Sequence, residues 1–178
     1  ISAYFNRLGN FLMRGIDILM AFPALLMALV LITLLERSVL NTIIVIGIVY
    51  ATTTARILFG MTLKLKGEVF IDAAICSGTG HSSILFRHIL PNLISPLLVQ
   101  ASFIFAFAQL QAAALDFLGL GLPPGSPSLG ELLNQGKNNL QAPWLGLSGF
   151  FVLALMLSLL IFIGEAVRDA FDPRKTFS

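Results

Sequence analysis

The chain has 178 residues, of which 57% are hydrophobic and only 11% are charged, and its mean hydropathy is +0.91. Soluble globular domains are usually about 45–50% apolar and about 25% charged, so this composition excludes an ordinary soluble fold. The single cysteine excludes an intramolecular disulfide, and that cysteine with two histidines is too small a donor set for a structural zinc site. A formal charge of +2 is too weak to indicate nucleic-acid binding. The composition predicts an integral membrane protein.

Four runs without a charged residue are long enough to cross a bilayer. They hold 18 residues between Asp17 and Glu36, 18 between Arg37 and Arg56, 28 between Arg87 and Asp116, and 27 between Lys137 and Glu165. A spanning helix needs about 20 mostly apolar residues. We therefore predict an all-α, polytopic fold with spans near 16–35, 41–63, 92–115 and 144–164. Pro23 and Pro96 are expected to bend the spans that contain them.

Basic residues are distributed unevenly between the two sides that these spans define. With four spans, the N-terminus, the segment 64–91 and the C-terminus share one side. That side holds Arg7, Arg14, Lys64, Lys66, Arg87, Arg168, Arg174 and Lys175. The opposite side holds only Arg37 and Lys137. Because cytoplasmic segments are enriched in Lys and Arg, we expect both termini and the segment 64–91 to be cytoplasmic.

A few polar residues fall at membrane depth. Arg56 lies eight residues before Lys64, which puts it about 12 Å from the cytoplasmic end of its helix. Snorkelling or pairing between helices explains Arg56, and contact with a transported substrate is the alternative. Gln109 and Gln111 in the third span and Asp116 at its outer end could also line a translocation cavity. Hydrogen bonds between helices explain the glutamines equally well.

The cytoplasmic segment 64–91 is predicted to be a helix–turn–helix. One side of its first helix is predicted to carry Val69, Phe70, Ala73, Ala74 and Cys76. Gly78 and Gly80 interrupt that helix, because glycine is unfavourable within helices and permits positive φ. A second amphipathic stretch, 81–90, is predicted to stop at Pro91. A helix that lies on a lipid surface is usually rich in Lys and Arg, but Arg87 is the only such residue between 67 and 91. Docking of this segment to a partner protein is therefore favoured over binding to the lipid surface.

The outer connection, about 116–143, contains four Gly and three Pro between residues 117 and 130. These residues cannot form a continuous helix. They are either buried in protein or line an aqueous cavity, and an ordinary solvated loop is the alternative. The stretch from Gly130 to Lys137 imitates a phosphate-binding loop, but one residue too many separates Gly130 from Gly136. We therefore expect no ATP site in this chain.

Several motifs resemble one known family. Asp72-Ala73-Ala74, followed by Gly78 and Pro91, resembles the E-A-A…G…L-P signature of the permease subunits of ABC importers. The stretch F-R-H-I-L-P-N at 86–92 is similar to the version found in the dipeptide, oligopeptide and nickel permease group. The same group is indicated by A-F-P at 21–23, F-L-G-L-G at 117–121, R-D-A at 168–170 and D-P-R at 172–174.

The resemblance implies that the segment 64–91 is a coupling segment that docks into a groove of an ATP-binding subunit. The docking residues that it implies are Asp72, Ala73, Ala74, Gly78, Arg87, His88 and Pro91. Asp72 stands where the family usually has Glu. The chain would have no catalytic residues and no cofactor of its own, because ATP is bound by partner subunits in such importers.

The implied assembly lies in the cytoplasmic (inner) membrane of a prokaryote. Its other members would be a second homologous permease subunit, two ATP-binding subunits and an extracytoplasmic substrate-binding protein. Peptides are the expected substrates, with nickel or another small solute as the alternative. The outer segment 116–143 would face the binding protein.

The resemblance implies that residues 1–178 form one permease domain that is incomplete at its N-terminus. Members of the family have about six spans, and the four spans predicted here match the last four. The start at Ile1 favours a fragment over a reduced subunit. A truncated, transport-inactive subunit is a further alternative. An intramembrane hydrolase using His81, His88, Ser82 and Ser83 is the remote one, because no carboxylate-oriented triad is visible in their spacing.

Overall fold

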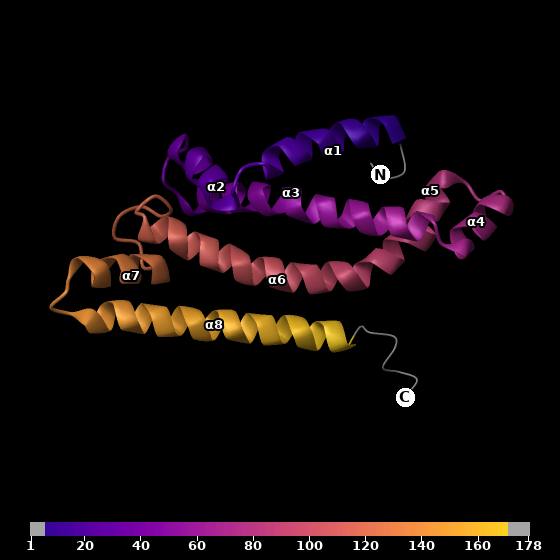
Figure 1. The fold of residues 1–178 in the computed structure, drawn as a ribbon. Helices are drawn as coiled ribbons and strands as arrows, with labels where there is room; N and C mark the ends of the chain where they lie inside the picture. The colour runs from indigo at the N-terminus through magenta and orange to yellow at the C-terminus, as the bar shows by residue number, and fades with distance from the viewer. Residues whose placement is uncertain (1–5, 171–178) are drawn as a thin grey trace. The chain divides into compact units, whose positions relative to one another are not determined.

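The structure, a computed structural model, describes residues 6–170, and every regular element in that range is a helix. Ile1, Arg174, Lys175 and the D-P-R motif at 172–174 lie outside the described residues. Figure 1 shows α1 (Asn6–Met20), α2 (Ala24–Thr33), α3 (Val39–Lys66), α4 (Val69–Cys76), α5 (His81–Ser83), the π-helical turn η1 (Ile84–Ile89), α6 (Leu90–Phe117), α7 (Leu129–Asn138) and α8 (Pro143–Ala170). The predicted all-α class is confirmed.

Three of the described helices are long and apolar enough to cross a membrane, namely Val39–Lys66, His81–Phe117 and Pro143–Ala170. They contain the predicted spans 41–63, 92–115 and 144–164. The first predicted span, 16–35, is instead divided between α1 and α2, which are bent by 88° at the break. Pro23 lies at that break and precedes α2, as expected for a residue that lacks an N–H and obstructs the preceding helical turn. By length and composition, the described residues thus hold three candidate spans, or four if the bent pair forms one.

The prediction that Pro91 stops the second cytoplasmic helix is wrong. The helix continues from His81 through Pro91 to Phe117. The turn η1 lies directly before the proline and has the wider π-helical geometry. A proline ring collides with the carbonyl four residues earlier in a regular α-helix, and a π-helical turn widens the backbone at that place. The local widening therefore lets the helix accommodate Pro91.

The described residues form two compact units, each with its own apolar core. The first unit holds residues 6–21, 52–101 and 166–170, and the second holds 22–51 and 102–165. The buried core of the first unit consists of Ile71, Ala74, Ile84, Ile89 and Leu93. The buried core of the second unit consists of Ala28, Ile32, Val45, Ile46, Val49 and Leu115.

Glycines bring helices of the second unit into close contact. A Cβ atom at Gly130 of α7 would overlap the carbonyl oxygen of Ala113 and lie 2.6 Å from the Cβ of Asp116, both in α6. A Cβ atom at Gly136 would overlap the backbone of Gly146 in α8. Small residues allow this approach of helix backbones, which is a common source of packing energy in membranes. The stretch that imitates a phosphate-binding loop is thus part of α7, and both of its glycines serve helix packing.

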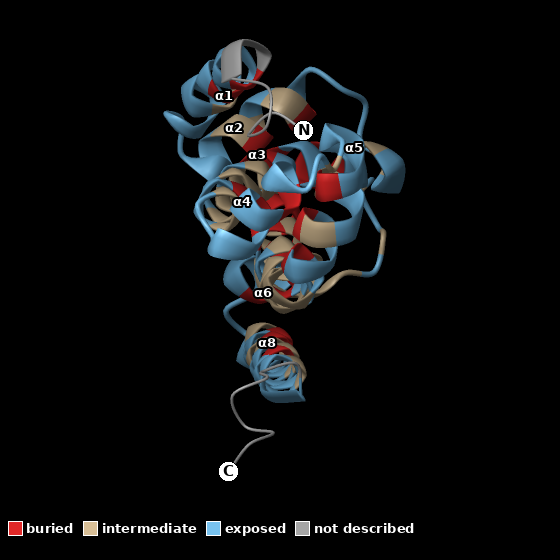
Figure 2. Ribbon diagram, turned by 90° about the vertical axis from the view of Figure 1, so that its right-hand side faces the viewer, coloured by how far each residue is buried: buried red, intermediate tan, exposed pale blue. Residues whose placement is uncertain are grey.

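Much of the apolar surface of α8 is exposed in the isolated chain (Figure 2). Gly149, Leu153 and Gly164 are its buried residues, whereas Phe151 and Phe162 are each 66% exposed. Contiguous apolar surface of this kind has to be covered by lipid or by another protein. The exposure is therefore consistent with a helix of a membrane complex.

Candidate functional site

The short helix α4 is anchored by two residues one turn apart. Ile71 and Ala74 are buried against Ile84, Ile89 and Leu93. Of the apolar residues predicted for one side of this helix, Ala74 is buried, and Val69, Phe70, Ala73 and Cys76 are exposed. The spacing i, i+3 places Ile71 and Ala74 on one face of the helix. That face is the one that packs onto the rest of the unit.

The rest of the surface of α4 carries exposed apolar side chains and a carboxylate, with Val69 opposite the buried face and Phe70 and Ile75 at its two edges. Val69 is 81% exposed, and Phe70 and Ile75 are 41% and 50% exposed. Asp72 and Ala73 are exposed between them. An exposed apolar patch next to a charged group is typical of a protein–protein contact.

The other predicted docking residues lie on two neighbouring stretches of the same unit. Gly78 has a φ of +75° in the turn that ends α4. Arg87 is exposed and His88 is half-buried in η1, and Pro91 is exposed at the start of α6. Since the core residues of α4 pack on η1, these stretches are adjacent. Ala74 faces away from any partner of the exposed face.

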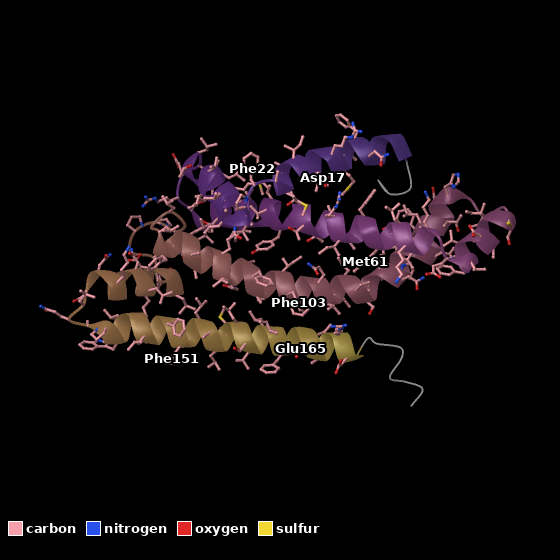
Figure 3. The ribbon with its side chains drawn as sticks, in the orientation of Figure 1. Asp17, Phe22, Met61, Phe103, Phe151 and Glu165 are labelled. Atoms are coloured by element: carbon pink, nitrogen blue, oxygen red, sulfur yellow. The ribbon has the colours of Figure 1, made fainter. Side chains whose placement is uncertain are left out.

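Arg56, the first predicted pathway residue, forms an ion pair with α1. Its Nη1 lies 2.6 Å from Oδ1 of Asp17, and the two side chains are 49% and 47% exposed. Figure 3 labels Asp17 on α1. The structure thus shows the pairing between helices that was one explanation for Arg56, and about half of each charged side chain is still accessible.

The other three predicted pathway residues lie in the second unit. Gln111 is buried, and its Nε2 donates to the carbonyl oxygen of Ala24 at 3.3 Å, which ties α6 to α2. Asp116 is 8% exposed, and its Oδ1 accepts a hydrogen bond from the backbone N–H of Leu122 at 2.9 Å. Gln109 is half-buried and lines a cavity. Arg56 belongs to the first unit, and these three residues belong to the second.

Two cavities of the second unit lie near Asp116. One, of about 410 Å³, lies between α3 and α6 and includes Tyr50 and Gln109 in its lining. The other, of about 250 Å³, is lined by the outer connection and includes Arg37, Glu131 and Asn134. The first residues of the connection are partly buried, whereas its tip around Gly125 is exposed. The connection is therefore neither wholly buried nor wholly a solvated loop.

The outer cavity was not predicted, because its charged and amide side chains come from three separate parts of the chain. Arg37 precedes α3, Asp116 ends α6, and Glu131 and Asn134 are on α7. Only the position of Asp116 at the end of a charge-free run pointed to this place in the sequence. No local motif connects it with Arg37.

The residues of the remote hydrolase alternative lie on one short stretch. His81, Ser82 and Ser83 are exposed in α5, and His88 is in η1. Within residues 6–170, no group of three or more His, Cys, Asp or Glu side chains is placed to hold a metal ion. The structural features that stand out are instead the exposed face of α4 and the two cavities beside Asp116.

Comparison with known proteins places the chain among transport proteins. The family of binding-protein-dependent transport system inner membrane components matches residues 1–177. The peptidoglycan transport system permease protein YejE of Agrobacterium fabrum is 44% identical over 178 residues, which are 99% of this chain and 47% of that protein. The inner membrane ABC transporter permease protein YejE of Escherichia coli is 57% identical over 113 residues, 64% of this chain and 33% of that protein.

A third relative is the dipeptide transport system permease protein DppC of Alkalihalophilus pseudofirmus. It is 38% identical over 176 residues, which are 98% of this chain and 58% of that protein. The two matches that cover nearly the whole chain span 47% and 58% of these relatives, so the chain corresponds to about half of their length. The family match confirms the resemblance seen in the motifs. The chain belongs to the family of binding-protein-dependent transport system inner membrane components.

Proposed function

We propose that the chain forms part of the translocation unit of an ATP-driven importer for peptides. The family and the transport names of the relatives support this proposal. Transport components of this kind contribute no catalytic residues, so the hydrolase alternative has no support from the family. The observation that carries the proposal is the exposed face of α4 on a segment that matches the docking motif of such permeases.

The exposed face of α4 is proposed to contact an ATP-binding subunit. Ile71 and Ala74 anchor the helix, and Val69, Phe70 and Asp72 are left for a partner. Burial of apolar side chains would contribute about 25 cal/mol for each Å² removed from water. The Asp72 carboxylate could pair with a basic group of the partner. Ala73, Gly78, Arg87, His88 and Pro91 surround this face, whereas Ala74 contributes only through the core.

The orientation follows from the distribution of basic residues. Lys64, Lys66 and Arg87 flank the segment that contains α4, and Arg37 and Lys137 lie at the opposite ends of the spans. We propose that the former group is cytoplasmic, as the positive-inside rule predicts. The broken pair α1 and α2 is counted as one span in this arrangement, which gives four spans and places both ends of the chain in the cytoplasm.

The proposed complex contains a second, homologous permease subunit, two ATP-binding subunits and an extracytoplasmic substrate-binding protein. The outer connection with its 250 Å³ cavity would face the binding protein. Gln109 and Asp116 are proposed pathway residues because both line the larger cavity. Arg56 and Gln111 are proposed to act through the helix contacts that they make.

Peptides are the proposed cargo because the relatives include dipeptide and di/tripeptide permeases. The relative named for peptidoglycan transport favours a second candidate, a peptide that carries cell-wall sugar. The complete transporter should be supplied with radiolabelled tripeptide, a disaccharide–peptide of the cell wall, or nickel ions. Uptake of either peptide that depends on ATP supports the proposal. Uptake of nickel alone would contradict it.

Docking through α4 is tested by isolating the complete subunit from membranes in mild detergent. The parent is compared with Asp72→Lys and Gly78→Asp, and Glu36→Lys, an equal charge change in the exposed loop before α3, is the matched control. We expect the ATP-binding subunit to accompany the parent and Glu36→Lys, and to be at least fivefold depleted with the two α4 variants. Equal recovery with all four proteins would contradict docking at this face.

A further inference from the structure

The two cavities of the second unit share a wall. Asp116 and Leu122 line both the 250 Å³ outer cavity and the 410 Å³ cavity between α3 and α6. The lining of the larger cavity follows α6 from Asp116 back to Ile104, which is about 18 Å at 1.5 Å per residue. The two spaces therefore meet at the end of α6, at Asp116 and at Leu122, the last residue of the segment 119–122.

The two cavities also differ in chemistry. The outer one is lined by groups that can bind charged or polar atoms, among them Arg37, Glu131 and Asn134. The inner one is mainly apolar, with Ile43, Ile46 and Phe105 in its lining. Displacement of the two residues that the linings share, Asp116 and Leu122, would join the two spaces.

A small set of contacts holds the segment 119–122 in this wall. The backbone N–H of Leu122 donates to Oδ1 of Asp116 at 2.9 Å. Gly121 lies directly against the same carboxylate, where a Cβ atom would overlap Oδ1. The hydroxyl proton of Thr42 is shared between the carbonyl oxygens of Ser38 at 2.9 Å and Gly121 at 3.2 Å. The backbone N–H groups of Gly119, Leu120 and Gly121 are held by the end of α6, because they donate to the carbonyl oxygens of Asp116 at 2.8 Å and of Leu115 at 2.9 and 3.3 Å. Within residues 6–170, the Asp116 carboxylate therefore secures the Leu122 end of the segment with a side-chain hydrogen bond that is not shared.

The placement of Asp116 explains why one side chain can hold this segment. The residue is in the last turn of α6 and is buried, and its neighbour Leu115 is fully buried in the core. A buried carboxylate needs hydrogen-bond donors, because its charge is otherwise costly to remove from water. The N–H of Leu122 meets that need only while the segment is in place.

We infer that the segment 119–122 is a gate between the two cavities and that Asp116 is the residue that holds it closed. The inference rests on the proposed function and orientation, in which the outer cavity faces the binding protein. Asp116 acts here as a positioning residue and does not itself need to contact the cargo. Release of its hydrogen bond would free the Leu122 end of the segment without unfolding α6, because the backbone bonds of residues 119–121 to the end of that helix would remain.

The gate is tested by the reaction rate of a thiol placed in the inner cavity. Gln109→Cys is introduced into the complete subunit within the assembled transporter, with Cys76 and any other cysteine replaced by serine. A membrane-impermeant sulfonated maleimide is added to the outside of spheroplasts. We expect slow labelling in the parent, and labelling at least tenfold faster when Asp116→Ala is added.

Two further variants separate gating from general damage to the fold. Asp116→Asn retains the Oδ1 acceptor and is expected to stay within about threefold of the parent rate. Thr42→Val keeps the side-chain shape and removes the shared contact, so it should increase labelling about threefold. It also tests the inference if Asp116→Ala does not assemble. Labelling unchanged by Asp116→Ala and Thr42→Val, or equally fast for Asp116→Asn and Asp116→Ala, would overturn the inference.

Ser126→Cys in the outer cavity controls for orientation. It should react rapidly from the outside, and Asp116→Ala should change its rate by less than twofold. If the Ser126→Cys thiol reacts only in inside-out vesicles, the proposed orientation is wrong. The labelling of Gln109→Cys is then measured with the reagent added to inside-out vesicles. A wrong orientation can therefore be distinguished from the absence of a gate.

Discussion

The turns that follow α4 and α6 end their helices with the same backbone geometry. Gly78 and Gly119 have φ values of +75° and +73°. In each case the next N–H donates to a carbonyl five residues earlier, from Thr79 to Ala74 at 3.1 Å and from Leu120 to Leu115 at 2.9 Å. This is the pattern of a glycine-terminated helix.

The two turns differ in what surrounds them. The turn at Gly78 is exposed and leads from a helix with exposed Val69 and Phe70. The turn after Gly119 is enclosed, because Gly121 and Gly130 both pack against Asp116. The same type of glycine turn thus follows an exposed helix in the first unit and begins the packed segment 119–122 in the second unit. The difference lies in side-chain contacts from distant parts of the chain.

The largest effect is expected where α7 packs closely on α6, beside the second of these turns. Gly130→Ala would place a Cβ atom against the backbone carbonyl of Ala113. Overpacking of this kind destabilises by about 3 kcal/mol, which thermal unfolding of the complete subunit in detergent should reveal as a lower midpoint. The matched control is Gly60→Ala, because its Cβ atom meets nothing within 4 Å. Unchanged midpoints for both variants would contradict the close packing of α7 on α6.

The next largest effect concerns the two glycines with positive φ. Gly78→Ala and Gly119→Ala each place a side chain in the left-handed region, where the cost is about 1–2 kcal/mol. Neither Cβ atom meets another atom within 4 Å, so the two losses should be similar when unfolding is measured in detergent. Asn tolerates this conformation better, and the Asn variants should recover part of the loss. A loss for one glycine alone would show that the turns are not equivalent.

A smaller difference is expected at the N-termini of α7 and α4. The Ser128 hydroxyl accepts a hydrogen bond from the N–H of Glu131 at 3.0 Å, whereas Glu68 makes no capping hydrogen bond at the start of α4. Ser128→Ala should therefore cost about 1 kcal/mol of unfolding free energy. Glu68→Ala should cost less than half as much. Equal losses in detergent unfolding would show that the cap is not what distinguishes these helices.

The smallest effect is expected for an accessible carboxylate, in contrast to the buried Asp116. Asp17 and Arg56 are each about half exposed, so solvent screening limits their coupling to less than about 1 kcal/mol in detergent. The coupling is measured with Asp17→Asn, Arg56→Gln and the double variant. A coupling several times larger would show that lipid or a partner excludes water from the pair.

Much of the helical framework could be predicted from the spacing of charges. The spans expected at 41–63, 92–115 and 144–164 lie within three long helices, because a charged side chain is costly inside a bilayer whatever its neighbours are. Pro23 also marked a bend correctly. The size of that bend, 88°, could not be predicted, since a proline accounts for a break in a helix and not for its angle.

The errors occurred where more than one residue had to act together. Pro91 does not stop its helix because the preceding π-helical turn accommodates it. The face of α4 that packs on the core contains Ile71 and Ala74, and the sequence did not indicate which face that would be. An apolar residue is compatible with a core, with lipid or with a partner protein. Composition alone therefore does not choose the face.

The sequence by itself determined the all-α class, the apolar helices and the family motifs, because these depend on local composition and on the short spacing of residues. Only the tertiary structure decided which polar groups meet. Thr42 reaches Gly121, Gln111 reaches Ala24, and Asp17 reaches Arg56 from positions far apart in the chain. Such contacts depend on how helices pack as whole bodies. No single segment encodes them.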